Sequence, residues 1–189
     1  MSTSTAERST HHHGNLRAAL IVAGIEMIES GENFSLRAVA RKVGVSQAAP
    51  YRHFSSKGDI EAAMAVHGFR ELQGDLEDVI AAHSDRHTPL VELALAYIHF
   101  AQAHPALYSL MFGQAYSDDE ERQTACSNVF ALIQDVAAQT HPNRSAHGLA
   151  TAGWALAHGL STLHLQRVLG SGDEGFDARV CEAFAALLD

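Results

Sequence analysis

Hydrophobic residues in the first part of the chain recur with the spacing of one helix face. Apolar side chains stand at intervals of three or four residues from Leu16 to Met27, and Gly31 is expected to end this helix. Ser35 can cap the N-terminus of a second helix, which we expect to end at Gly44 because glycine readily adopts a positive φ.

The next segment predicts a third, short helix from Gln47 to Phe54, with Ser46 as its cap. Pro50 lies inside this segment and lacks a backbone donor. We therefore expect the third helix to be short or distorted.

A long fourth helix is expected from residue 55 or 56 to about residue 82, and its apolar residues change face along its length. The first face holds Ile60, Ala63, Met64 and His67, and the second, about 160° away at ~100° per residue, holds Phe69, Leu72, Leu76, Val79 and Ile80. Gly68 lies between the two faces. Either the helix packs against two different bodies, or it is buried all round in one larger core.

Five further helices are expected, over residues 88–103, 105–112, 118–140, 144–169 and 177–188. Prolines stand at or near the start of three of them, where proline is tolerated. Ser117 and Glu120 have the spacing of a capping box. Because no strand pattern of convincing length occurs, the chain is predicted to be all-α.

The composition is that of a folded protein without a membrane span. Hydrophobic residues make up 47% of the 189 positions and charged residues 19%, so a core can form. No apolar run approaches the roughly 18 residues of a membrane helix, and no secretory signal is visible. Cys126 and Cys181 match no metal-ligand spacing and suit a reducing compartment. We therefore expect a cytoplasmic protein that does not bind a membrane.

Charge is divided unevenly along the chain, whose net charge is −9. Residues 1–58 hold seven Lys and Arg against four Glu, which gives +3, whereas residues 59–189 hold six basic and eighteen acidic residues, which gives −12. A basic end is compatible with binding to nucleic acid, although an excess of three charges also occurs by chance.

The segment from Ser35 to Phe54 has the organisation of a helix-turn-helix. Ala40 and Gly44 are four residues apart, which gives a small residue where two helices cross and then a sharp turn. In such a unit the second helix enters the major groove of DNA. Many helical hairpins share the pattern, so this segment alone is not specific.

Longer stretches make a resemblance specific. Residues 11–58, HHHGNLRAALIVAGIEMIESGENFSLRAVARKVGVSQAAPYRHFSSKG, resemble the DNA-binding domain of the TetR family of transcriptional regulators. HPALYSLMFG at 104–113 and WALAHG at 154–159 resemble the C-terminal domain of a TetR subgroup that carries a Trp–His–Gly motif. We therefore divide the chain into a mobile Ser/Thr-rich tail at 1–10, a helix-turn-helix domain at 11–58, and a helical effector-binding and dimerisation domain at 59–189.

The resemblance implies DNA contacts around the predicted turn and at the starts of the flanking helices. The residues that match the family there are Ser35, Arg37, Gln47, Ala48, Ala49, Tyr51, Arg52, His53 and Lys57. Those at 35–49 would contact bases or a neighbouring phosphate. Phosphates would be bound by Tyr51, His53 and Lys57, and Arg52 would contact either a base or the backbone. Tyr51 could instead pack partly into the fold. Gly58 stands where many relatives have an acidic residue, which predicts a looser first turn of the fourth helix.

The resemblance also implies a homodimer formed by the last two helices and a ligand cavity. The apolar stripes expected at the dimer interface contain Leu156, Leu160, Leu163, Val180, Phe184 and Leu187, although each of these residues could face the core of its own subunit. Large groups on inward-facing stripes are the candidates for the effector pocket, namely Phe69, Tyr97, Phe100, Met111, Trp154 and His158. The last two could line a pocket or merely pack.

Other patterns are weak. The GxGxxG match at 170–175 follows no strand, so we interpret it as a loop that binds no dinucleotide. His83, Asp85 and His87 are expected where the fourth helix ends and do not predict a metal site. The histidines at 11–13 lead into the first helix. No catalytic set of nucleophile, base and acid occurs in a suitable context, and neither a cofactor nor a metal is expected.

Together these observations predict a regulator, not an enzyme, that binds double-stranded operator DNA as a repressor and releases it on binding a small apolar or aromatic effector. Two alternatives stay open: an all-helical enzyme, and a helical adaptor that binds only protein. DNA binding that weakens with salt would separate the regulator from both.

Overall fold

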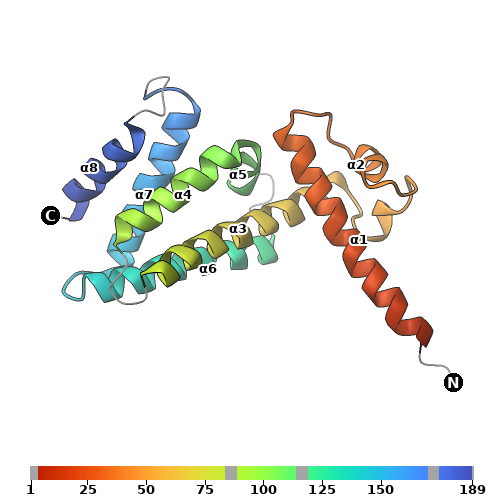
Figure 1. Cartoon of the computed structure of the whole chain (residues 1–189), viewed down its shortest axis with the longest axis horizontal. Coiled ribbons are helices and arrows are strands. Elements are labelled where there is room, and N and C mark those ends of the chain that lie inside the picture. Colours follow the sequence, from red (N-terminus) through yellow and green to blue (C-terminus); the bar gives the residue numbers. More distant parts are fainter. Residues whose placement is uncertain (1–3, 84–88, 114–118, 170–174, 189) are drawn as a thin grey trace.

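The computed structural model describes residues 4–83, 89–113, 119–169 and 175–188, with side chains from Leu16 onward. All regular elements in these ranges are helical (Figure 1), which confirms the predicted all-α class. The elements are α1 (Ser4–Glu29), α2 (Leu36–Val43), the 3-10 helix η1 (Pro50–Arg52), α3 (Lys57–Ala82), α4 (Leu90–Ala103), α5 (Pro105–Met111), α6 (Glu120–Thr140), α7 (Ala146–Leu165) and α8 (Phe176–Leu188).

The predicted ends of the first two helices and the predicted cap of the second are confirmed. Gly31, just after α1, has φ 72°. The Ser35 hydroxyl oxygen accepts the backbone N–H of Ala38 at 3.1 Å and caps α2. Gly44 ends α2 with φ 78°, a conformation in which a side chain would be strained.

The segment after α2 contains less helix than the prediction of 47–54. Residues 47–49 form a turn, and only η1 is helical. Most backbone hydrogen bonds of this segment span three residues. The N–H of Ala49 donates to the Ser46 carbonyl at 2.9 Å, and the N–H of His53 donates to the Pro50 carbonyl at 2.9 Å. Pro50 has no N–H to donate to an α-helical bond, which accounts for the distortion.

Two other helix starts differ from the predictions. Helix α1 begins at Ser4 and not near Leu16, because no proline interrupts the chain between them; the mobility of the tail at 1–10 stays a prediction. Helix α6 is capped by Asp119, whose carboxylate accepts the N–H of Arg122 at 2.8 Å. The predicted cap Ser117 lies outside the described residues.

Helix α3 belongs to two hydrophobic cores. Ile60 and Met64 pack with residues of α1 and α2 in one core, whereas Phe69 and Leu72 belong to a larger core with residues of α4 to α8. The interpretation that α3 packs against two bodies is therefore confirmed. His67 is an exception, because 45% of its side chain is exposed and it does not join the first face.

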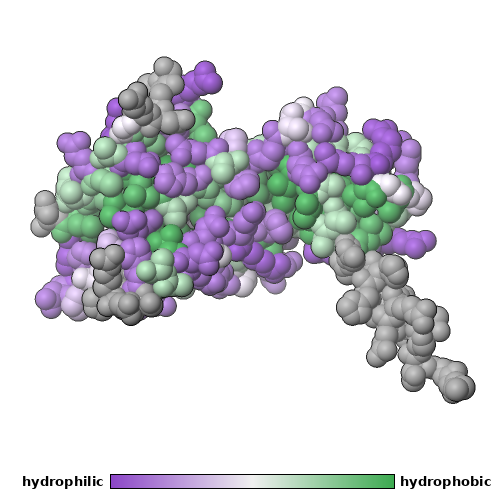
Figure 2. All heavy atoms as spheres, in the orientation of Figure 1, coloured by the Kyte–Doolittle hydropathy of each residue, from purple (hydrophilic) through white to green (hydrophobic). Residues whose placement is uncertain are grey.

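The larger body is a stack of antiparallel and crossing helices. Helix α3 packs against α4, α5 and α6, while α7 packs against α4 and α6, and α8 covers α4 and α7 at the end of the molecule opposite α2 (Figure 1). Hydrophilic residues cover much of the visible face around α1, α2 and the middle of the molecule, and hydrophobic atoms reach the surface near α8 (Figure 2). Among the described helices, none combines the length and the apolar character needed to cross a membrane.

Candidate nucleic-acid interface and ligand cavity

The residues predicted to contact DNA lie on one end of the molecule, on α2, on the turn that follows it and at the start of α3 (Figure 1). Most of them have exposed side chains, namely Ser35, Arg37, Gln47, Ala48, Tyr51, Arg52 and Lys57. Ala49 and His53 are half-buried. Tyr51 is 51% exposed, an unusual position for an aromatic residue, so its hydroxyl is available to an external partner.

Lys57 is held in place at the first turn of α3. Its ammonium lies 3.3 Å from the Glu61 carboxylate and 5.4 Å from the centre of the Phe34 ring, yet 58% of its side chain remains exposed. The neighbouring Phe54 is 2% exposed and lies beneath the guanidinium of Arg17, at 5.3 Å. The aromatic rings thus anchor two cations at the surface that could face a phosphate backbone.

The first turn of α3 is capped despite the glycine at position 58. The Ser56 hydroxyl oxygen accepts the N–H of Asp59 at 3.1 Å, and the Asp59 carboxylate accepts the Ser56 hydroxyl at 2.6 Å and the N–H of Ser55 at 2.8 Å. These hydrogen bonds hold the pKa of Asp59 below its usual value, and the bond from the Ser56 hydroxyl contributes most. Asp59 therefore supplies, one residue later, the carboxylate that many relatives carry at the position of Gly58.

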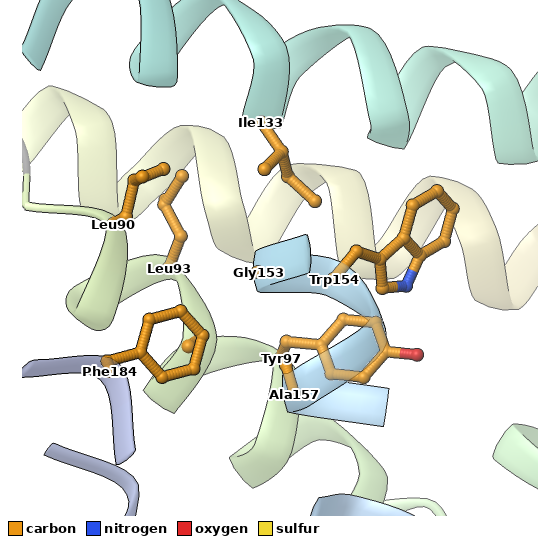
Figure 3. Close-up of a pocket in the computed structure, with 9 residues that line it drawn as sticks. Leu90, Leu93, Tyr97, Ile133, Gly153, Trp154, Ala157 and Phe184 are labelled. Carbon is orange, nitrogen blue, oxygen red and sulfur yellow. The ribbon is translucent and has the colours of Figure 1, made fainter. Parts of the chain in front are cut away.

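Two of the cavities in the larger body lie against α7. The smaller one, of about 20 Å³, is enclosed by side chains of α4, α6, α7 and α8, among them Leu93, Tyr97, Trp154 and Phe184 (Figure 3). It has room for about one water molecule. The larger one, of about 440 Å³, is within the range of small-molecule sites. It is lined by Phe112, Cys126, Phe130, Thr151, Trp154, Ala155 and His158.

The larger cavity has aromatic walls. The rings of Phe130 and Trp154 are stacked with centroids 5.7 Å apart and an interplanar angle of 27°. On the other side, Phe112 meets the His158 ring edge to face at 4.6 Å. A flat apolar ligand could be enclosed between such surfaces.

Two tyrosines hold the His158 ring. The Tyr108 hydroxyl lies 2.6 Å and the Tyr97 hydroxyl 2.9 Å from Nδ1, and the two hydroxyls are 3.4 Å apart. Burial raises the pKa of both phenols and lowers the pKa of His158. All three groups are therefore uncharged at neutral pH.

The structure brings together only part of the predicted pocket. Trp154 and His158 line the larger cavity, and Tyr97 lines the smaller one while contacting His158. Phe69, Phe100 and Met111 are at most 3% exposed and line neither of these two cavities. They fill the close-packed core, because an inward-facing position does not distinguish packing from a cavity wall.

Several residues in or beside the wall of the larger cavity were not predicted. They are Phe112, Cys126, Phe130, Thr151 and Ala155 in the cavity wall and Tyr108 beside His158. Tyr108 and Phe112 lie in the HPALYSLMFG stretch that the sequence already singled out, so that motif was a usable signal. Thr151 and Ala155 precede His158 on α7 at helical spacing, but only the tertiary structure shows that this face borders a cavity.

The residues predicted for the dimer interface divide into two groups. Leu163 is 38% exposed, and Leu156, Leu160 and Leu187 are half-buried. The prediction is corrected for Val180 and Phe184, which are 0% and 2% exposed within the single subunit and belong to its core. Both side chains point back to α4 and α7 because α8 covers these helices.

Helix α5 connects the two bodies. The Glu29 carboxylate, at the end of α1, accepts the N–H of Leu107 at 2.8 Å and of Ala106 at 3.2 Å. At the other end, the Arg122 guanidinium of α6 donates to the Met111 carbonyl at 2.5 and 3.0 Å. A carboxylate at the N-terminus and a cation at the C-terminus both stabilise a helix dipole.

The described residues contain no group of three or more His, Cys, Asp and Glu side chains that could hold a metal ion. Asp85, His87 and residues 170–174 of the glycine-rich match lie outside the described ranges.

Two known families match separate parts of the chain. Residues 22–64 match a family described as "Bacterial regulatory proteins, tetR family", and residues 90–189 match one described as "Tetracyclin repressor-like, C-terminal domain". The nucleoid occlusion factor SlmA of Marinobacter nauticus is 25% identical over 128 residues, 66% of each chain. SlmA of Vibrio vulnificus is 32% identical over 114 residues, 57% of each chain. The present chain thus spans just under two thirds of the length of these curated relatives, or less.

Solved structures share the fold over nearly the whole chain. A protein of unknown function from Rhodococcus sp. RHA1 is 30% identical, with a TM-score of 0.76 over 89% of this chain and 91% of that one. A TetR family transcription regulator from Marinobacter aquaeolei VT8 shares the fold at 17% identity, with a TM-score of 0.65 over 95% and 97% of the two chains. With the matches at both ends of the chain, these findings show that the protein belongs to the TetR family of bacterial regulatory proteins.

Proposed function

We propose that this protein is a homodimeric transcriptional repressor, with no enzymatic activity, that releases operator DNA when a small effector fills the larger cavity. The observation that supports DNA binding best is the exposed polar and cationic set around α2, η1 and the start of α3. The proposed domain limits are those of the sequence analysis, with DNA binding at 11–58 and effector binding and dimerisation at 59–189. The Trp154–His158–Gly159 set supports assignment to the subgroup with the Trp–His–Gly motif.

In the proposed complex, Gln47 reads a base edge while the methyl groups of Ala48 and Ala49 lie beside thymine. Tyr51 and Lys57 bind phosphates of the DNA backbone at the edge of the same groove. Such phosphate contacts determine affinity and position, whereas the contacts from the turn determine sequence preference. Arg37 and Arg52 are exposed on neighbouring elements and add positive charge to this surface.

Two copies are needed because operator half-sites in successive major grooves require a two-fold axis. We propose that the axis passes between the exposed faces of α7 and α8. Leu156, Leu160 and Leu163 on α7 keep exposed or half-exposed apolar area. Small exposed residues on α8, Ala178, Cys181 and Ala185, share one helix face and allow a close approach.

Release of DNA is proposed to involve both connections between the bodies. Helix α3 crosses from the first core to the second, and α5 carries Tyr108 beside the cavity and is bonded to Glu29 of α1. An effector that favours one arrangement of these helices would change the spacing of the two DNA-binding surfaces.

The test is fluorescence anisotropy with labelled DNA from the region flanking the coding sequence of this protein. We expect the Tyr51→Phe, Lys57→Ala double variant to lose most of its affinity, and wild-type affinity to fall steeply with salt. Arg70→Ala is the matched control, since its side chain is 62% exposed against 58% for Lys57 and lies on the same helix away from the proposed surface. Full binding by the double variant would contradict the proposed surface.

A further inference from the structure

The hydrogen bonds around His158 determine which of its nitrogens carries the proton. Both tyrosine hydroxyls need an acceptor, and their shortest contacts, 2.6 and 2.9 Å, are to Nδ1. If Nδ1 carried the proton, Tyr97 would be left with Tyr108 at 3.4 Å, and Tyr108 with the His158 carbonyl at 3.5 Å or the hydroxyls of Ser161 and Thr162, and both tyrosines would lose their shortest acceptor. Nδ1 is therefore the acceptor and the proton is on Nε2.

The Nε2–H group is left as the second polar group of the ring. No described residue is recorded as its hydrogen-bond partner, and His158 lines the larger cavity. The Thr151 hydroxyl already donates to the His147 carbonyl at 2.8 Å. The Trp154 indole N–H interacts with the Tyr97 hydroxyl, toward which it points in Figure 3. A ligand in the cavity would thus meet one strong donor fixed in position by two tyrosines.

The described lining of this cavity contains no charged side chain. Its residues are aromatic or small, apart from the uncharged Thr151, Cys126 and His158, and burial raises the pKa of the Cys126 thiol. A carboxylate or an ammonium group bound against this lining would meet no opposite charge among the described residues. The nearby Arg122 guanidinium is bonded to the Met111 carbonyl and does not line the cavity.

We propose that the larger cavity binds an uncharged, planar aromatic compound carrying a carbonyl or an equivalent acceptor. Its ring lies along the Phe130 and Trp154 pair, and its oxygen accepts the Nε2–H of His158. That this compound acts as the effector rests on the proposed function, but its binding to the cavity can be measured without DNA.

The experiment uses three probes of nearly equal shape: 2-acetonaphthone, 2-ethylnaphthalene and 2-naphthoate. Trp154 is the single tryptophan of the chain, so quenching of its fluorescence reports occupancy of this cavity directly. We expect saturable binding of the ketone, about tenfold tighter than that of the hydrocarbon, which lacks the acceptor. The carboxylate should bind at least as weakly as the hydrocarbon.

Two variants locate the interaction. His158→Asn keeps an oxygen near the position of Nδ1 for the tyrosines but lacks Nε2, so the ketone should bind about tenfold more weakly while the hydrocarbon is unaffected. Ala155→Phe places a ring in the cavity from an exposed position and should weaken all three probes. Selectivity of the wild-type protein for the ketone needs no variant and stays decisive if His158→Asn fails to fold.

The proposal is overturned if no probe binds, if the hydrocarbon or the carboxylate binds as tightly as the ketone, or if a folded His158→Asn variant keeps the full preference. These outcomes are distinct from failure of the proposed function. A protein that binds operator DNA but not the ketone contradicts the ligand class alone, whereas one that binds the ketone but no DNA contradicts the regulator alone.

Discussion

At the scale of single residues, the surface proposed for DNA separates affinity from selectivity. Gln47 is exposed on the turn before η1 and has a side-chain amide that can form two bonds to an adenine edge. Tyr51 and Lys57 can reach only the backbone in the proposed arrangement, and backbone contacts carry little sequence information.

We therefore expect Gln47→Ala to reduce discrimination at one or two base pairs by ~1–3 kcal/mol, with little change for the remaining positions. Binding to a library of single-base operator variants would measure this. A uniform loss over all positions would instead place Gln47 among the phosphate contacts.

Another residue-scale prediction concerns acid. Burial depresses the pKa of His158 in the folded protein, while the unfolded chain has an ordinary histidine pKa near 6.5. The unfolded state thus takes up a proton first as the pH falls, so the free energy of unfolding should decrease below about pH 6.5. Urea titrations at pH 7.5 and 5.5 should show a smaller decrease for His158→Asn than for the wild type. An equal decrease in both proteins would refute this role of His158.

At the scale of elements, Gly68 on α3 is a packing position as well as a helix interruption. A Cβ atom there would lie 2.6 Å from the Met111 sulfur and 3.1 Å from Leu107 Cγ, both on α5. Gly74, six residues later on the same helix, has no atom within 4 Å of such a Cβ. Alanine substitutions at the two glycines therefore separate the effect of crowding against α5 from the effect of helix propensity.

We expect Gly68→Ala to lower the free energy of unfolding by about 1–3 kcal/mol through overpacking, and Gly74→Ala to raise it by roughly 0.5–1 kcal/mol. DNA affinity without effector should change little in either protein. The power of an effector to release DNA should change only in Gly68→Ala. Chemical denaturation and a DNA-release titration would measure the two effects, and equal responses of both variants would exclude α5 as a connection.

Helix ends and faces could be predicted from sequence where one residue fixes them. Ser35, Gly44 and the change of face along α3 are such cases, since capping, positive φ and helical periodicity are local properties. The cavity could not be predicted in the same way, because Phe69 and Phe130 look alike in a hydrophobic stripe. Only the packing of α6 against α7 makes Phe130 part of the cavity wall, while Phe69 is a core residue.

At the scale of the whole molecule, assembly depends on which apolar residues the subunit leaves uncovered. Leu163 is partly exposed on α7, whereas Phe184 is already buried on the inner face of α8. We therefore expect a charge at either position to impair DNA binding, but for different reasons.

We expect Leu163→Glu to give a folded monomer with greatly weakened DNA binding and Phe184→Glu to give an unfolded or aggregated chain. Val168→Glu is the control, since Val168 is 63% exposed just beyond the end of α7. Light scattering with circular dichroism separates these outcomes. A wild-type protein that is monomeric at micromolar concentration would contradict the proposed assembly.

The short helix α5 has a further consequence for the thermodynamics of the molecule. Seven residues are too few to remain helical alone in water, so α5 depends on its buried side chains, on the Glu29 carboxylate at one end and on Arg122 at the other. Its opening must require less free energy than global unfolding. The backbone amides of Ala106 and Leu107 would then exchange with deuterium whenever Glu29 moves away. Their exchange rates therefore report how often the contact between α1 and α5 opens, on a part of the molecule that joins the DNA-binding end to the rest.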